Sequence, residues 1–225
     1  MPFELKNVVP WGRSFEEYTS MFSLSQDELN LKILGCSDGP ASFNATMNRL
    51  GKNCISIDPL YQFTKNEIKN RIDESFHEVL EQARKNKNEF IWKNIKTVKE
   101  LGDIRKEAME KFLADYELGK KEGRYIYGEL PHIHFINNQF DIALCSHFLF
   151  LYSKQFSFRF HLDSIIELCR VAKEVRIFPI LELGSKISRH FDKICKILSD
   201  KGYQVKIKKV AYEFQKGGNQ LLIVN

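Results

Sequence analysis

Two glycines and one aspartate of this chain have the types and the spacing that suit a bound nucleoside. Gly35 and Gly39 allow a tight turn and let a ligand approach the backbone with no Cβ in the way. Asp58 follows about 20 residues later, where a carboxylate at the end of a strand can accept hydrogen bonds from both hydroxyls of a ribose. The spacing therefore predicts a nucleoside site with Asp58 at the ribose.

The segments around these residues fit a strand, a turn, a helix and a second strand. Apolar residues between 31 and 34 stop at the turn, and a second apolar run between 54 and 57 stops at Asp58. Pro40 suits the first turn of the helix. Proline has no backbone N–H, and an N–H at this position of a helix would have no intrahelical partner. We therefore expect a β-loop-α-β unit over residues 31–61, which is half of a nucleotide-binding domain.

Three segments of the chain resemble motifs of the class I S-adenosylmethionine-dependent methyltransferases. Residues 35–41 (GCSDGPA) resemble the first motif of that family, and residues 55–58 resemble the strand whose last acid holds the cofactor's ribose. Residues 137–147 (NNQFDIALCSH) resemble the fourth strand. The three motifs occur in the family's order and cover most of residues 31–180.

The resemblance implies S-adenosylmethionine as the cofactor and S-adenosylhomocysteine as the product. Two positions depart from the family pattern: Ser37 stands where glycine is usual, and Ile33 stands where an acid usually anchors the cofactor's amino group. Asp38 or a water molecule is then left to make that contact. The cofactor-binding residues that the resemblance implies are Arg13, Gly35, Cys36, Ser37, Gly39, Asp58, Pro59, Glu129, Leu130 and Ser146.

Two other parts of the chain contribute to this prediction. Glu129 and Leu130 lie in a segment that resembles the loop holding adenine, one as a polar contact and the other as an apolar cover. The opening of the chain resembles that of a little-characterised bacterial branch of the family, so Trp11, Arg13 and Tyr18 could close over the cofactor or bind its carboxylate. Arg13 is the strongest candidate, because a guanidinium can bind a carboxylate with two hydrogen bonds. The alternative is that the aromatic residues only pack on the sheet.

His147 is the candidate catalytic residue. It follows Ser146 at the end of the fourth strand, and strand ends in open α/β sheets face the ligand crevice. Its ordinary pKa makes it a suitable general base near neutral pH, although it could instead cap the next helix or contact the cofactor. The strand end lacks an Asn-Pro-Pro-Tyr type of motif, which favours an oxygen, a carboxylate or another small-molecule acceptor over the amino groups of bases and glutamines.

Other functions remain open from the sequence. A dinucleotide-binding enzyme using NAD is disfavoured, because its Gly-x-Gly-x-x-Gly fingerprint is missing and bulky Phe43 follows the turn. A SAM- or nucleoside-binding module without catalysis stays possible, since Ser37 and Ile33 depart from the family pattern. An RNA methyltransferase is a further alternative, and it would bind RNA through lysines in a salt-dependent way.

The expected fold is α/β: a Rossmann-like, mostly parallel sheet of seven strands with helices on both faces. The resemblance implies the order 3-2-1-4-5-7-6 with the last strand antiparallel. In the C-terminal part the pattern predicts a strand at 175–181, a helix at 185–201, and strands at 203–214 and 220–224 that form a hairpin.

Two segments extend this plan, and we expect all of residues 1–225 to form a single methyltransferase domain. Residues 1–30 are predicted to be an arm and a helix that begins after Ser14. Residues 62–119 are polar, rich in lysine and glutamate, and have apolar residues at helical spacing. They predict a helical insertion after the second strand that serves as a lid or as a dimer surface, so a homodimer is possible.

Composition limits the class of protein. The chain has 225 residues, of which 43% are hydrophobic, and shows no run of 18 apolar residues, so we expect a cytoplasmic protein with no membrane partner. A net charge of +5 permits a nucleic-acid partner without indicating one. The five cysteines are not paired as in zinc sites, and His132 and His134 have no third ligand nearby, so we expect no bound metal.

Overall fold

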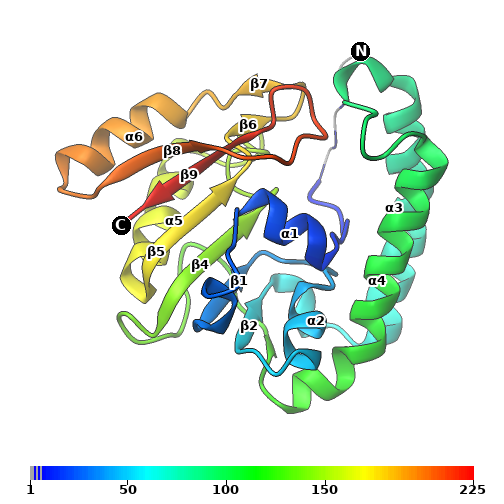
Figure 1. Cartoon of the computed structure of the whole chain (residues 1–225), viewed down its shortest axis with the longest axis horizontal. Coiled ribbons are helices and arrows are strands. Elements are labelled where there is room, and N and C mark those ends of the chain that lie inside the picture. The colour runs from blue at the N-terminus through cyan, green and yellow to red at the C-terminus, as the bar shows by residue number, and fades with distance from the viewer. Residues whose placement is uncertain (1–2, 4, 6) are drawn as a thin grey trace.

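A sheet of seven strands forms the centre of the structure, a computed structural model that describes residues 3, 5 and 7–225. Its strand order is β3-β2-β1-β4-β5-β9-β8 (Figure 1). The first five strands run parallel, while β9 is antiparallel to both of its neighbours. This confirms the predicted Rossmann-like order. The strands are β1 (Ile33–Cys36), β2 (Cys54–Ile57), β3 (Tyr125–Ile126), β4 (Phe140–Ser146), β5 (Ala172–Phe178), β8 (Val205–Lys209) and β9 (Gln220–Val224).

Helices cover both faces of this sheet, as its apolar central strands require. Helices α1 (Phe15–Met21) and α2 (Phe43–Arg49) pack on one face, where their apolar residues join those of β1 and β4. Helices α5 (Phe158–Val171) and α6 (Phe191–Asp200) pack on the other face. Ser14 caps α1 as predicted, in a reciprocal capping box with the side chain of the third helical residue.

Two long helices occupy the segment after β2. Helix α3 (Lys65–Lys85) and helix α4 (Val98–Lys121) run side by side along one side of the molecule (Figure 1). Each begins with a threonine cap, Thr64 or Thr97. Their apolar stripes meet a buried aromatic cluster at the edge of the sheet that includes Tyr61 of the 3-10 turn η2 (Pro59–Gln62).

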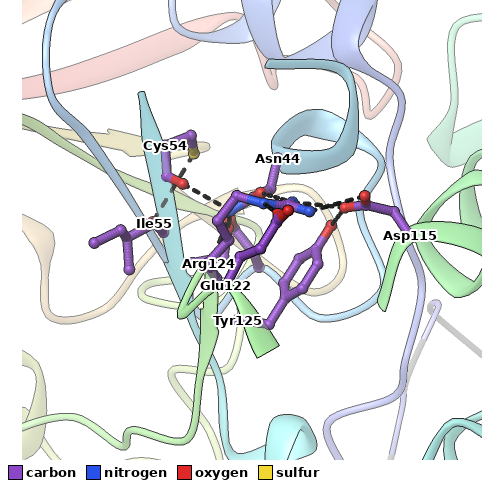
Figure 2. Close-up of polar contacts among 9 residues, drawn as sticks. Asn44, Cys54, Ile55, Asp115, Glu122, Arg124 and Tyr125 are labelled. Atoms are coloured by element: carbon purple, nitrogen blue, oxygen red, sulfur yellow. Dashed lines mark hydrogen bonds and ion pairs between the residues drawn. The ribbon is translucent and has the colours of Figure 1, made fainter. Parts of the chain in front are cut away.

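A polar network fixes α4 to this edge of the sheet. Arg124, just before β3, donates two hydrogen bonds to Asp115 of α4, with N–O distances of 2.6 and 2.9 Å (Figure 2). It also donates to the side chain of Asn44 in α2 at 2.9 Å, and Asn44 in turn donates to the Cys54 carbonyl in β2 at 3.2 Å. The hydroxyl of Tyr125 donates to Asp115 as well. The network therefore joins α2, α4, β2 and β3.

The boundaries of several elements differ from the sequence predictions. The first helix after the turn begins at Phe43 and not at Pro40: Pro40 still belongs to the turn, and the first helical hydrogen bond runs from the Thr46 amide to the Ser42 carbonyl. The predicted strand at 175–181 begins and ends earlier, at Ala172 and Phe178.

Two C-terminal predictions were wrong in more than their boundaries. The predicted helix at 185–201 is confined to α6, because the residues before it form a small hairpin of β6 (Leu181–Glu182) and β7 (Lys186–Ile187). The predicted strand at 203–214 ends at Lys209, and residues 210–219 leave the sheet. They cross to the link between α3 and α4, where the Ile91 amide donates to the Phe214 carbonyl at 2.7 Å.

No helix within residues 3, 5 and 7–225 is long and apolar enough to span a bilayer.

Candidate functional site

A cavity of about 750 Å³ opens at the carboxyl ends of β1, β2 and β4. It lies where ligands bind in open α/β sheets. Of the residues that the sequence implicated, Gly35 and Cys36 do not line this cavity. Those that do line it are Trp11, Arg13, Tyr18, Ser37, Asp38, Gly39, Asp58, Pro59, Glu129, Leu130, Ser146 and His147.

The turn after β1 brings backbone and side chains to the cavity wall. Ser37 and Gly39 have φ angles of 55° and 52°, in the left-handed region. A Cβ built on Gly39 would meet no atom within 4 Å in the described part of the chain, so the positive φ, and not crowding, favours glycine there. Ser37 carries the same backbone conformation with a side chain, which a non-glycine residue adopts less readily.

Gly35 leaves room for the side chain of Asp38, which was not predicted from the sequence. A Cβ at this position would lie 1.7 Å from a carboxylate oxygen of Asp38, so the space is filled by the chain itself and not by a ligand. The Asp38 carboxylate accepts hydrogen bonds from the Tyr18 hydroxyl at 2.9 Å and the Ser56 hydroxyl at 2.7 Å. Burial raises the pKa of Asp38 to about 7, although both of these hydrogen bonds lower it. Asp38 can therefore change its charge near neutral pH.

Asp58 braces the turn against the end of β2. Its carboxylate oxygens accept hydrogen bonds from the Gly39 amide at 2.8 Å and the Leu60 amide at 2.7 Å. Each oxygen of a carboxylate has a second lone pair, so Asp58 can still accept hydrogen bonds from a ligand. Burial raises the pKa of Asp58 to about 6.

His147 sits at the end of β4 in a left-handed backbone conformation, with a φ of 52°. Its amide donates to the Phe178 carbonyl at 2.6 Å, and its Nδ1 shares a hydrogen bond of 3.0 Å with the Ser146 hydroxyl. Burial lowers the pKa of His147 well below its usual range, and the charges of Arg13 and Arg105 lower it further. The imidazole is therefore neutral at pH 7.

A buried group of charges lies beside His147. Arg105 of α4 forms a two-pronged ion pair with Glu17 of α1, in which Nη2 lies 2.7 Å from Oε1. The Tyr212 hydroxyl donates to the same carboxylate at 2.8 Å. Burial alone would raise the pKa of Glu17, but the charge and hydrogen bonds of Arg105 bring it down to about 2. Glu17 is therefore ionised at neutral pH.

Arg13 adds a second guanidinium to this group. Its Nη1 donates to the Trp11 carbonyl at 3.2 Å. Burial lowers the pKa of Arg13, and the charge of Arg105 lowers it further. The buried Nε atoms of Arg13 and Arg105 have no hydrogen-bond partner among residues 3, 5 and 7–225.

Three residues of this group, Glu17, Arg105 and Tyr212, were not identified from the sequence. A signal for Arg105 was present, because it occupies a position on the apolar stripe of α4, one turn after Leu101 and one turn before Met109. A lone arginine on such a stripe indicates a buried ionic partner. Nothing in the sequence identified that partner as Glu17, which lies 88 residues away.

The cavity has two halves of different character. The polar half is formed by strand ends and the loops after them: Ser37, Asp38, Gly39, Asp58, Glu129 and Ser146. The apolar half is formed by α3, α4, the segment after β4 and the loop after β8: Val79, Leu101, Phe148, Leu151, Phe156 and Phe214. We call Arg13, Arg105 and His147 the junction of the two halves. In the sequence His147 separates Ser146 of the polar half from Phe148 of the apolar half, and Arg105 lies one helical turn from Leu101 of the apolar half.

The histidines after β3 do not form a metal site in the structure. His132 and His134 are both exposed. Within residues 3, 5 and 7–225, no group of three or more His, Cys, Asp or Glu side chains is arranged to hold a metal ion.

The chain is similar over nearly its full length to the uncharacterized protein MJ0045 of the archaeon Methanocaldococcus jannaschii. The two are 39% identical over 221 residues, which is 98% of this chain and 97% of that protein. No family model matches the chain.

Solved structures also resemble the fold. An O-methyltransferase family protein from Burkholderia thailandensis matches with a TM-score of 0.50 and 12% identity over 93% of this chain, which spans only 55% of that chain. The magnesium protoporphyrin IX methyltransferase of Synechocystis, crystallised with SAM, matches with a TM-score of 0.48 and 11% identity over 93% of this chain and 76% of that one. At such identities, structural likeness concerns the fold alone.

Proposed function

This chain belongs to the same family as MJ0045 of M. jannaschii and has the fold of the class I S-adenosylmethionine-dependent methyltransferases, and on that premise we propose that it transfers a methyl group from S-adenosylmethionine to a small molecule. One observation carries the proposal. The turn after β1, the acid after β2, the loop after β3 and the end of β4 all line the same cavity. Each of these segments was expected at the site, either from its own residues or from the resemblance to the class I methyltransferases.

The polar half of the cavity fits the proposed cofactor. Asp58 retains lone pairs for the ribose hydroxyls, and Glu129 and Leu130 border the place proposed for adenine. Arg13 has a buried, unpaired Nε–H in the described structure for the carboxylate, and Asp38 can be ionised to meet the amino group. Gly35 and Cys36 act through the turn and not by contact, since they do not line the cavity.

The chemistry needs little more than positioning. S-adenosylmethionine supplies a methyl group on a positively charged sulfur, which any well-placed nucleophile can accept. The chain's own residues bind and orient the two reactants and exclude water, which is where most of the rate enhancement of such a displacement originates. His147 is neutral at pH 7 and can donate a hydrogen bond to an acceptor that is already ionised. It can also take a proton from a hydroxyl acceptor, but its lowered pKa makes it a weaker base than an ordinary histidine.

Calorimetric titration tests the proposal. We expect S-adenosylmethionine and S-adenosylhomocysteine to bind with micromolar affinity and NAD not to bind. Replacing Asp58 with Asn keeps the size of the side chain but removes the charge, and it should weaken binding by roughly tenfold or more, because hydrogen bonds to a charged group are worth about 1.5–3 kcal/mol. Asp163→Asn is the matched control and should bind like the wild type, because Asp163 is a half-buried residue of α5 that pairs with the exposed Arg159 and does not line the cavity.

The outcomes separate the proposal from its alternatives. If neither S-adenosyl compound binds the folded wild-type chain, the methyltransferase proposal fails. Tight binding with no methyl transfer to any acceptor would instead favour a non-catalytic cofactor-binding module. Salt-dependent RNA binding with transfer to RNA would favour the nucleic-acid alternative. The homodimer and the cytoplasmic location remain predictions.

A further inference from the structure

A series of hydrogen bonds leads from His147 to the buried carboxylate of Asp38. The Nδ1 atom of His147 shares a hydrogen bond of 3.0 Å with the Ser146 hydroxyl. The Ser146 hydroxyl is also hydrogen-bonded to the side chain of Tyr18, whose hydroxyl donates to Asp38 at 2.9 Å. All four residues line the cavity. We call Asp38, Tyr18 and Ser146 the positioning chain, because they connect the turn after β1 to the end of β4.

The direction of these hydrogen bonds is set at the carboxylate. An ionised carboxylate can only accept hydrogen bonds, so Tyr18 uses its single hydroxyl proton toward Asp38. The Tyr18 oxygen can then only accept from Ser146, and Ser146 has no second proton to give to His147. The Ser146 oxygen therefore accepts from His147. This places the imidazole proton on Nδ1 and leaves a lone pair on Nε2.

The surroundings hold the carboxylate end of the positioning chain in place. The buried ring of Tyr18 stacks on Phe43 of α2 at 4.8 Å between centroids. The second Asp38 oxygen accepts from the Ser56 hydroxyl at 2.7 Å, and the side-chain amide of Asn44 donates to that hydroxyl at 3.1 Å. Each carboxylate oxygen keeps a second lone pair, so Asp38 can still meet the amino group of the cofactor. Both roles need the ionised form of Asp38.

The Nε2 atom of His147 is left for a ligand. His147 is half-buried and lines the cavity. Among the described residues, 3, 5 and 7–225, its ring has no hydrogen-bond partner other than Ser146. A lone pair on Nε2 can accept a hydrogen bond from a hydroxyl group, but it has nothing to donate to an acceptor that is already ionised.

We propose that the positioning chain holds His147 in the tautomer with its proton on Nδ1, and that Nε2 takes the proton from a hydroxyl group of the methyl acceptor. This inference rests on the proposed methyltransferase function. Of the two roles open to a neutral His147, only proton acceptance fits this tautomer, because donation to an ionised acceptor needs a proton on Nε2. The acceptor group is therefore a hydroxyl.

Electrons and charge balance in this step. A lone pair of the hydroxyl oxygen forms the new O–C bond, while the bond between that carbon and sulfur breaks and its electron pair stays on sulfur. The O–H proton moves to Nε2, so the positive charge lost by the sulfonium appears on the imidazole. Burial and the charges of Arg13 and Arg105 lower the pKa of His147, so the imidazolium gives its proton to water once the products leave. The neutral base is then restored.

Nitrogen-15 NMR of the folded chain with S-adenosylhomocysteine tests the inference, because the chemical shift of each ring nitrogen reports whether it carries a proton. Spectra are recorded at pH 8, since burial raises the pKa of Asp38 to about 7 and the carboxylate must be ionised. His147→Gln identifies the His147 signals among those of the six histidines. We expect the proton on Nδ1 in the wild type. A proton on Nε2 would overturn the inference, because that nitrogen could not take another.

Variants locate the cause of the tautomer. Tyr18→Phe removes the acceptor of the Ser146 proton, which can then turn to Nδ1, so the proton of His147 should shift to Nε2. Ser146→Ala removes the partner of Nδ1 and should shift the proton in the same direction, which keeps the test available if Tyr18→Phe does not fold. Tyr212→Phe is the matched control, because the Tyr212 hydroxyl donates to Glu17, and it should keep the wild-type tautomer. A wild-type tautomer in folded Tyr18→Phe or folded Ser146→Ala would overturn the inference.

Titration of the same samples with S-adenosylhomocysteine separates this inference from the proposed function. If S-adenosylhomocysteine does not bind the folded wild-type chain, the proposed function fails, whichever tautomer is present. If it binds while the proton lies on Nε2 or does not move in the variants, the inference fails and the proposed function stands.

Discussion

The polar half of the cavity is built from short loops at the ends of neighbouring strands, whereas the apolar half is assembled from segments far apart in the chain. Residues of the polar half are fixed by hydrogen bonds within and between neighbouring strand ends, such as those that the Gly39 and Leu60 amides donate to the Asp58 carboxylate. Residues of the apolar half depend on contacts between α3, α4, the arm and residues 210–219. We therefore expect the first region to keep its geometry when the second is altered.

The largest effect that we expect comes from the ion pair joining the two regions. Arg105→Leu leaves the Glu17 carboxylate buried without its partner, which should lower the free energy of unfolding by about 3–5 kcal/mol. Urea denaturation measures this loss in the free energy of unfolding. Arg84→Leu on the surface of α3 should change stability by less than about 0.5 kcal/mol. Equal effects of the two variants would contradict the structural role of Arg105.

The same ion pair should make the stability of the folded chain depend on pH. The pKa of Glu17 is about 2 in the folded chain, below the ordinary value of 4.5. Its contribution to stability is therefore complete above pH 4.5 and is lost as the pH falls towards 2. In the double variant Glu17→Gln with Arg105→Leu, stability should fall less steeply over this window. Identical slopes for the wild type and the double variant would show that Glu17 does not titrate as described.

An intermediate effect is expected where the loop after β8 meets the insertion. Phe214 stacks on Phe90 at 5.0 Å between centroids and meets Trp92 edge-on. Phe214→Ala should cost about 2 kcal/mol, less than a fully buried phenylalanine, because its side chain is half-buried. Hydrogen exchange should become faster at residues 86–97 and 210–219. Affinity for S-adenosylhomocysteine should stay unchanged, and a large loss of that affinity would show that the two halves are not separate.

The smallest effect concerns the start of α3. Thr64 accepts a hydrogen bond from the Glu67 amide and completes a capping box. Thr64→Ala should lower stability by about 1 kcal/mol. Thr64→Ser, which keeps the hydroxyl, is the control, and thermal denaturation compares the two. A serine variant as unstable as the alanine variant would mean that the cap contributes nothing.

What the sequence predicted well was determined by residues close together in the chain. The turn after Gly35, the acid at Asp58 and the cap at Ser14 each depend on neighbours within one or two elements, and the strand order was implied by the resemblance to the class I methyltransferases. The start of α2 was misplaced because Pro40 belongs to the turn that Gly39 makes with its positive φ, and the first helical hydrogen bond joins the Thr46 amide to the Ser42 carbonyl.

The junction shows why the rest could not be predicted. Glu17 looked like an ordinary member of a capping box, and Arg105 lay among many lysines and glutamates of the insertion. Their pairing depends on how the insertion packs against α1, which no local pattern specifies. Residues 210–214 were predicted to belong to a strand for the same reason, since they instead contact the link between α3 and α4.

A crystal structure of the chain with S-adenosylhomocysteine tests the central claim most directly. We predict that the ribose hydroxyls lie within hydrogen-bond distance of Asp58, that adenine lies beside Leu130, and that the carboxylate of the bound molecule meets Arg13. The apolar half of the cavity should stay free of it. A ligand bound elsewhere, or one that fills the apolar half and leaves Asp58 without contact, would contradict the account.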